Sequence, residues 1–169
     1  MEQKIKKKKV IISKSHTTKL PEYQTKGSAG CDVRADINLP VWIHPGEMRT
    51  IPTGLRIKIP EGYEIQIRSR SGLAFKKMIV ILNSPGTIDD DYRDEIKILL
   101  INYGKEPYQV TKGEKIGQFV MNKVEKIQWD EITEQQFNEI VKVEKEQGIN
   151  RLQSPQRLFF AGIFCFYQS

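Results

Sequence analysis

The sequence predicts an all-β fold, and two of its features support that prediction. In residues 55–59 and 63–67, Leu, Ile and Tyr occupy every second position, with charged or polar residues between them. Residues that favour turns, mainly Pro and Gly, separate such runs. Because side chains on a strand point alternately to two faces, this pattern indicates half-buried strands. Many short strands at this spacing are typical of a sandwich or a barrel.

The expected strands follow one another along most of the chain. Residues 55–59 and 63–67 flank the turn Pro60-Glu61-Gly62, which predicts a hairpin. The predicted strands are 9–13, 31–37, 47–51, 55–59, 63–67, 78–82, 96–102, 107–110 and 116–124, with further turns at His44-Pro45-Gly46, Ser84-Pro85-Gly86 and Lys112-Gly113.

Two helical segments are also expected. Ser71 can cap a single turn through residues 73–77, because its hydroxyl can accept a hydrogen bond from a free backbone N–H. A phosphate would be well placed there, beside Arg70. The alternative is an ordinary capped turn with a surface arginine. Residues 133–146 form the second candidate, with Phe137, Ile140, Val141 and Glu144 on one face and no evident chemistry.

Length and composition suit one domain with a real core, since the chain has 169 residues. No apolar run approaches the roughly 18 residues of a membrane span, and the start lacks the apolar segment of a secretory signal. Cys31 and Cys165 lie far apart without metal-ligand spacing, so neither a disulfide framework nor a zinc site is predicted. We therefore expect a soluble, cytoplasmic protein, with a nuclear location as the alternative in a eukaryote.

The net charge of +6 is concentrated at the start of the chain. Residues 1–10 hold Lys4, Lys6, Lys7, Lys8 and Lys9, and we expect a disordered basic arm there. Such a run could instead be a weak polyanion tether or a nuclear-import signal. No basic stripe with interleaved aromatic residues occurs, so no specific nucleic-acid binding is expected.

The most distinctive segment is Gly86-Thr87-Ile88-Asp89-Asp90-Asp91-Tyr92-Arg93-Asp94-Glu95. Asp89 follows strand-like residues, so its carboxylate is expected at a strand end, where it could activate a water. Tyr92 could lay its ring against a sugar or a base. The alternative is a solvated acidic turn or a loose cation site.

Four blocks of the chain resemble the first four motifs of dUTPases, in family order and at similar separations. They cover about residues 18 to 132 and comprise Ala29-Gly30-Cys31-Asp32-Val33 with Ala35, Ser69-Arg70-Ser71-Gly72-Leu73-Ala74, the acidic segment above, and Gly113-Glu114-Lys115-Ile116-Gly117-Gln118. The resemblance implies the β-clip, distorted jelly-roll fold of trimeric dUTPases. It implies a β domain over 11–146 and a homotrimer whose sites are shared between subunits.

The implied reaction is Mg²⁺-dependent hydrolysis of dUTP to dUMP and pyrophosphate, which supplies dUMP for thymidylate synthesis and keeps uracil out of DNA. Asp89 matches the general base. Asp32 and Gln118 match residues that touch Mg²⁺ through water. The positions that match substrate-binding residues are Arg70, Ser71, Gly72, Asn83, Gly86, Thr87, Ile88, Tyr92, Lys97 and Gln118.

Simpler interpretations of single residues stay open. Asp32 can be a turn aspartate, and Lys115 and Gln118 can face solvent on a strand. His16 and His44 lack any neighbouring pattern for a triad or a ligand set, so both are expected to be structural or surface residues.

Four residues depart from the family pattern within these blocks. Ser69 stands for proline, Asp94 for glycine, Lys115 for arginine and Gly117 for alanine. A glycine in a turn can have a positive φ, and a carboxylate at position 94 adds negative charge near a polyanion. Lys115 keeps the charge but lacks the bidentate fork of arginine.

A fifth, glycine-rich motif that closes over the nucleotide in the family does not occur in residues 147–169. A shifted reading frame or a replaced terminus would explain this segment, and weaker closure with lower turnover is expected. Two hypotheses remain: an active or impaired dUTPase, or a protein of this fold that binds nucleotide or protein without efficient catalysis. A related deaminase acting on dCTP is a third.

Overall fold

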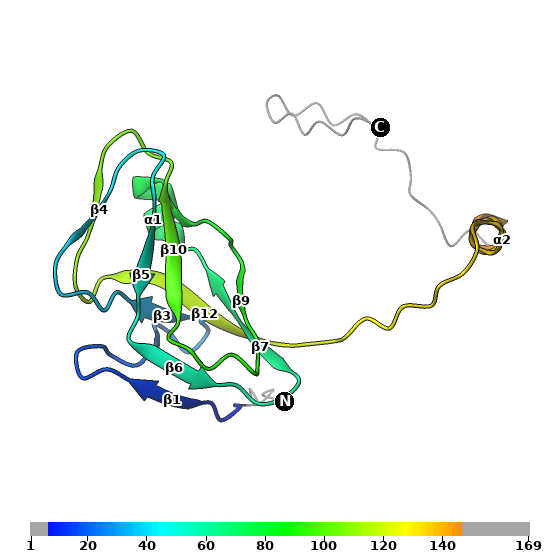
Figure 1. Cartoon of the computed structure of the whole chain (residues 1–169), viewed down its shortest axis with the longest axis horizontal. Helices are drawn as coiled ribbons and strands as arrows, with labels where there is room; N and C mark the ends of the chain where they lie inside the picture. Colours follow the sequence, from blue (N-terminus) through cyan, green and yellow to red (C-terminus); the bar gives the residue numbers. More distant parts are fainter. Residues whose placement is uncertain (1–6, 147–169) are drawn as a thin grey trace. The chain divides into compact units, whose positions relative to one another are not determined.

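The computed structural model describes residues 7–146 (Figure 1). Residues 1–6 of the expected basic arm, the expected tail 147–169 and Cys165 lie outside the described residues. Contacts divide the chain into two compact units, Met1–Lys126 and Ile127–Ser169. We call the first the β unit and describe each unit by itself.

A five-stranded antiparallel sheet carries five of the twelve predicted site residues, namely Asp32, Gly86, Thr87, Ile88 and Gln118. Its order is β2 (Glu22–Tyr23), β3 (Cys31–Arg34), β12 (Lys115–Lys123), β7 (Tyr63–Arg68) and β9 (Gly86–Ile88). The register sets Asp32, Gln118 and Arg68 directly opposite one another on three neighbouring strands. Residues opposite one another share a face of the sheet, so these three side chains start from the same face.

Three smaller antiparallel sheets complete the β unit. They are β5 (Met48–Pro52), β10 (Lys97–Asn102) and β8 (Ile79–Ile81); β1 (Ile11–Lys14) with β6 (Leu55–Lys58); and β11 (Tyr108–Val110) with β4 (Val41–Ile43). The buried core is dominated by isoleucine, including Ile43, Ile51 and Ile98. Such β-branched side chains favour extended backbone and pack well on pleated surfaces. The predicted all-β fold class is confirmed.

The predicted hairpin between residues 55–59 and 63–67 is wrong. Strand β6 pairs with β1, whereas β7 pairs with β12 and β9. The turn itself forms, since the Tyr63 N–H donates to the Pro60 carbonyl at 3.2 Å. Alternation shows which face of a strand is buried but not which strand lies beside it, so the chain passes here from one sheet to another. Strands β2 and β4 were not predicted, and β9 was indicated only by the strand-like residues before Asp89.

Helix α1 (Ser71–Lys77) follows β7 directly. The prediction that Ser71 caps it is wrong, because Arg70 is the N-cap residue and, within the described residues, no side chain makes a capping hydrogen bond. The Ala74 N–H donates to the Arg70 carbonyl at 3.0 Å, so the first helical turn already includes Ser71. The helix ends at Met78, whose φ of 56° is the left-handed conformation common at helix ends.

Helix α2 (Glu134–Glu146) confirms the second predicted helix. Thr133 and Gln136 form a reciprocal cap: the Thr133 N–H donates to Gln136 Oε1 at 2.9 Å, and the Gln136 N–H donates to Thr133 Oγ1 at 3.3 Å. Its apolar residues Phe137 and Ile140 are exposed. None of the helices in residues 7–146 is long and apolar enough to cross a membrane.

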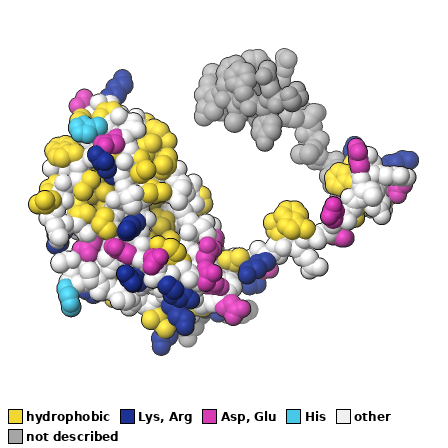
Figure 2. All heavy atoms as spheres, in the orientation of Figure 1, with side chains coloured by type: hydrophobic (Ala, Val, Ile, Leu, Met, Phe, Trp, Pro, Cys, Tyr) yellow, Lys and Arg dark blue, Asp and Glu magenta, His cyan; other side chains and the backbone are white. Residues whose placement is uncertain are grey.

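The visible face of the β unit mixes charges of both signs with hydrophobic side chains (Figure 2). Within the described part of the lysine run, residues 7–9 are exposed, and Lys8 Nζ lies 4.9 Å from the centre of the Tyr63 ring. A cation at this distance from an aromatic face makes a weak attractive contact with it.

Candidate active site

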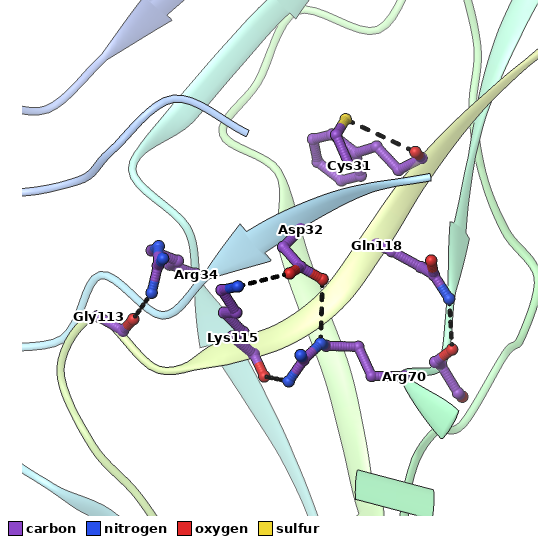
Figure 3. A network of polar contacts seen from close by, with 9 residues as sticks. Cys31, Asp32, Arg34, Arg70, Gly113, Lys115 and Gln118 are labelled. Carbon is purple, nitrogen blue, oxygen red and sulfur yellow. Dashed lines mark hydrogen bonds and ion pairs between the residues drawn. The ribbon is translucent and has the colours of Figure 1, made fainter. Parts of the chain in front are cut away.

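Asp32 lies at the centre of a polar network on the five-stranded sheet (Figure 3). Arg70 Nε donates to Asp32 Oδ1 at 3.0 Å, and Lys115 Nζ lies 2.8 Å from Asp32 Oδ2. Arg70 also donates from Nη1 to the Lys115 carbonyl at 3.0 Å. Two cations are therefore fixed beside one carboxylate, and the network as a whole carries a positive charge that suits an anion.

The Asp32 side chain is only 10% exposed. Its Oδ2 atom is buried, and among residues 7–146 the group that compensates it is the Lys115 ammonium at 2.8 Å. A carboxylate in such a place depends on its cations, because burying an uncompensated charge is costly.

Gln118 is fixed at the edge of this network. Its Nε2 donates to the Ser69 carbonyl at 3.1 Å, and the Ser69 hydroxyl accepts from the Ile81 N–H at 2.9 Å. A Cβ on Gly30 would lie 2.5 Å from Gln118 Oε1. Glycine at position 30 therefore leaves the space in which the Gln118 amide lies.

Two ionisable groups near the Asp32 network, the Tyr108 hydroxyl and the Cys31 thiol, stay protonated at neutral pH. Burial, followed by the Glu114 carboxylate that accepts from its hydroxyl, raises the pKa of Tyr108. Burial is also the largest cause of the raised pKa of the Cys31 thiol, which approaches the Phe119 carbonyl at 3.7 Å. A protonated thiol is a poor nucleophile, so Cys31 has no evident chemical part in the site.

A pocket of about 250 Å³ lies beside β7, β9 and β10. It contains six of the predicted substrate-binding residues, namely Asn83, Gly86, Thr87, Ile88, Tyr92 and Lys97, together with Ile67, Ile81, Ile98 and Leu99. Apolar walls with a few polar groups are typical of pockets for small organic ligands.

Asp89 directly follows β9 and is exposed, as the strand-end prediction expected. The Tyr92 N–H donates to the Asp89 carbonyl at 3.2 Å, and the Tyr92 hydroxyl donates to the Glu95 carbonyl at 3.1 Å. These bonds fold residues 89–95 into a compact turn beside the pocket.

The predicted residues thus fall into two groups, the Asp32 network with Gln118 and the pocket with Asp89. Among residues 7–146, no hydrogen bond or ion pair joins one group to the other. Ser71 and Gly72 are exposed in the first turn of α1, and a Cβ on Gly72 would meet no atom of the described part of the chain within 4 Å.

Comparison with known proteins decides the family. A family model described as dUTPase matches residues 16–149, well over half of the chain. The chain belongs to the dUTPase family. The deoxyuridine 5'-triphosphate nucleotidohydrolase of Fusobacterium nucleatum is 48% identical over 130 residues, covering 77% of this chain and 89% of that protein. The protein of the same name from Chlamydia trachomatis is 52% identical over 116 residues, covering 69% and 80%.

Solved dUTPase structures share the fold. The dUTPase from phage phi11 of S. aureus superposes with a TM-score of 0.68 at 25% identity, covering 75% of this chain and 97% of that one. The dUTPase of Staphylococcus bacteriophage 80alpha gives the same TM-score, identity and coverage. With these neighbours, the predicted jelly-roll fold is confirmed.

The structure accommodates two of the departures from the dUTPase motifs. A Cβ on Gly117 would lie 3.1 Å from the Cδ1 atoms of both Ile81 and Ile98, so these isoleucines occupy the space that the family's alanine would use. Met78 is the only non-glycine residue with a positive φ among residues 7–146, so Asp94 has ordinary backbone geometry. The remaining difference between Asp94 and the family's glycine is the negative charge of the Asp94 carboxylate.

Sequence reasoning treated Lys115 only as a departure from the pattern and left it out of the predicted site. The structure places its ammonium against Asp32. The signal was present in the sequence, since the residue lies in the same block as Gln118, but its partner lies 83 positions earlier in the chain and could not be identified from spacing.

Mg²⁺ is expected in a dUTPase. The structure of a mutant dUTPase from phage phi11 shows the coordination of a structural Mg(II) ion in that protein. In residues 7–146, no group of three or more His, Cys, Asp or Glu side chains is placed to hold a metal. Asp32 already faces two cations, and Gln118 offers a neutral carbonyl oxygen. This donor set fits Mg²⁺ held by phosphates and water rather than in an all-protein cage, which is the usual arrangement for this ion.

Proposed function

We propose that this chain is a dUTP diphosphatase that hydrolyses dUTP to dUMP and pyrophosphate. The observation that supports this most strongly is that a dUTPase-family chain carries both a pocket lined by predicted substrate-binding residues and a cationic network around Asp32. The product dUMP would serve thymidylate synthesis, and removal of dUTP would keep uracil out of DNA. The bacterial relatives and the nucleotide substrate together favour a cytoplasmic location.

In this proposal Asp89 is the general base. It accepts a proton from a water whose oxygen forms a bond to the α-phosphorus, while the bond from that phosphorus to the bridging oxygen breaks and pyrophosphate leaves. A positioned base contributes about 10²–10⁴ in rate. The exposed place of Asp89 at the end of β9 leaves its carboxylate accessible to such a water.

The triphosphate would be bound by the Asp32 network and the start of α1. Arg70 supplies guanidinium donors, Ser71 a hydroxyl and Gly72 an open backbone approach. Lys115 adds a second positive charge 2.8 Å from Asp32. Charges fixed in advance stabilise the charge that develops on the phosphates without rearranging during the reaction.

Mg²⁺ would be held by the phosphates and by water molecules that contact Asp32 and Gln118. When bound, it neutralises phosphate charge and restrains the phosphate chain. Gln118 would present its amide carbonyl, because its nitrogen already donates to the Ser69 carbonyl.

The pocket would select the nucleoside. Asn83 and the backbone of Gly86, Thr87 and Ile88 would pair with the uracil edge, Tyr92 would pack against the deoxyribose, and Lys97 would lie at the pocket wall. Exclusion of the thymine methyl by shape is worth about 1–3 kcal/mol, whereas mismatched hydrogen bonds to cytosine cost more. Rejection of dCTP should therefore be stronger than rejection of dTTP.

We include a homotrimer with shared sites in the proposal. Among residues 7–146, no hydrogen bond or ion pair connects Asp89 with the Asp32 network, which is consistent with sites completed by a neighbouring subunit. A second candidate function is nucleotide binding without efficient catalysis, which is favoured by the absence of the glycine-rich motif in residues 147–169.

The deciding experiment measures pyrophosphate release from dUTP, with and without Mg²⁺, for the wild type and Asp89→Asn, with dCTP and dTTP as controls. We expect release that is selective for dUTP, needs Mg²⁺ and falls at least about 100-fold in the variant. Binding of dUTP without release would favour the second candidate, and ammonia from dCTP would indicate the deaminase.

A further inference from the structure

The acidic loop 89–95 is held to the rest of the β unit by two of its own carboxylates. Asp90 Oδ2 accepts from the Gly62 N–H at 3.1 Å, and Glu95 Oε1 accepts from the Gly54 N–H at 2.8 Å. Gly62 lies in the turn between β6 and β7, and Gly54 lies in the turn between β5 and β6. The loop is thus bound to two turns that are far from it in sequence.

Both glycines are fixed parts of the fold. Gly54 has a φ of 67° and Gly62 a φ of 76°, conformations in which other residues are strained. The Gly62 carbonyl accepts from the Val124 N–H at 3.0 Å, and the Gly54 carbonyl accepts from the Ser15 N–H at 2.8 Å. Each of the two glycines therefore uses both its N–H and its carbonyl in hydrogen bonds, and the loop is attached to fixed points of the backbone.

We propose that Asp90 is a positioning residue for the reaction: its hydrogen bond to the β6–β7 turn holds the adjacent Asp89 carboxylate in the place where it receives the proton of the attacking water. This inference rests on the proposed function of Asp89. Along the chain, β9 directly precedes Asp89. Asp90 directly follows it, and the hydrogen bond from the Gly62 N–H to the Asp90 carboxylate holds the chain on that side. Misplacement of a reacting group by about 1 Å can cost about 100-fold in rate.

The role depends on an acceptor atom and not on charge. The partner of Asp90 is a neutral backbone N–H, so a side-chain amide oxygen can replace the carboxylate. Asp90→Asn keeps an acceptor at the same place, whereas Asp90→Ala removes it. Comparison of these two variants separates the effect of the hydrogen bond from the electrostatic effect of a charge beside Asp89.

The test measures kcat and KM for dUTP and the thermal midpoint of the full-length wild type, Asp90→Ala, Asp90→Asn and Glu61→Ala. Glu61 is exposed, lies in the same turn and makes no side-chain hydrogen bond among the described residues, so its variant removes a charge without releasing the loop. We expect Asp90→Ala to lower kcat about 10- to 100-fold with KM changed less than about threefold, and the other two variants to stay within about threefold of wild type.

Three results would overturn the inference: wild-type kcat in Asp90→Ala, an equal loss in Asp90→Asn, or a loss that parallels a fall in the thermal midpoint in every variant. Asp89→Asn is measured alongside. An inactive wild type would refute the proposed function itself, whereas an active wild type, an inactive Asp89→Asn and an unaffected Asp90→Ala would refute only the positioning role.

Discussion

Asp32 is the residue on which the charge balance of the network depends. It is the carboxylate between Arg70 and Lys115, whose side chains are 30% and 23% exposed. Without it the two cations would face each other across a partly buried space. The aspartate therefore allows both positive charges to be present before any phosphate arrives.

Asp32→Asn should lower the free energy of unfolding by about 1–3 kcal/mol, less than for a fully buried pair because both cations are partly exposed to water. Urea unfolding at low salt measures this, with the exposed Asp130→Asn as the control. An Asp32→Asn protein as stable as wild type would show that the ion pairs contribute nothing net. Added salt should reduce the difference, since it screens the remaining charges.

The residue types of the site were predictable from the sequence, but their contacts were not. Asp89 and Tyr92 were found because they share one short segment, and the structure places them at one strand end. The partners of Asp32 lie 38 and 83 positions away in the chain, and those of Asp90 and Glu95 lie in two other turns. Local spacing carries no information about such contacts, which depend on which strands become neighbours.

At the scale of elements, Asp36 joins three segments of the β unit. Its carboxylate accepts from the hydroxyls of Ser15 and Thr17, and its N–H donates to the Pro52 carbonyl at 2.8 Å. Burial acts to raise the pKa of Asp36, but these hydroxyls, with Lys112 and Lys14, outweigh it and hold the pKa below its usual 3.8. Asp36 thus helps to fix the segment that follows β1 against the end of β5.

A lowered folded-state pKa stabilises the fold above the unfolded pKa, and this contribution is lost as the pH falls through the folded value. The stability difference between wild type and Asp36→Ala should therefore be constant above about pH 5 and shrink below the usual pKa of 3.8. Urea unfolding over this range, with Asp130→Ala as the control, measures it. A difference that does not change with pH would mean that the charge of Asp36 has no part in it.

The order of strands was less predictable than the strands themselves. Alternation identified β6 and β7 because each buries every second residue. It then suggested a hairpin, whereas the two strands belong to different sheets. Strand β2 was missed because it has only two residues, too few to show a period. Strand β4 was also missed, although β8 and β11 have three residues as well and were predicted.

At the scale of the whole molecule, the proposal that sites are shared between subunits leads to a prediction about assembly. If sites are shared in this way, one subunit supplies Asp89 and another supplies Arg70 to the same site. Asp89→Asn and Arg70→Ala then remove residues that come from different subunits. Both variants should be inactive alone, and mixed trimers formed by co-expression should recover part of the wild-type activity. Pyrophosphate release from the purified mixture measures this, with sedimentation to confirm three chains per particle. No recovery in a confirmed mixed trimer would place both residues of a site in one chain.

The central position of β12 also has a consequence for synthesis. It lies between β3 and β7 although it is the last strand of the β unit, so Asp32 can meet Gln118 only after the ribosome has made nearly all of the β unit. Until then, β3 and β7 each have an edge without its final partner, which slows folding and exposes hydrogen-bonding groups to wrong pairing. On the proposed function, a nascent chain therefore lacks the triphosphate site until this late pairing has formed.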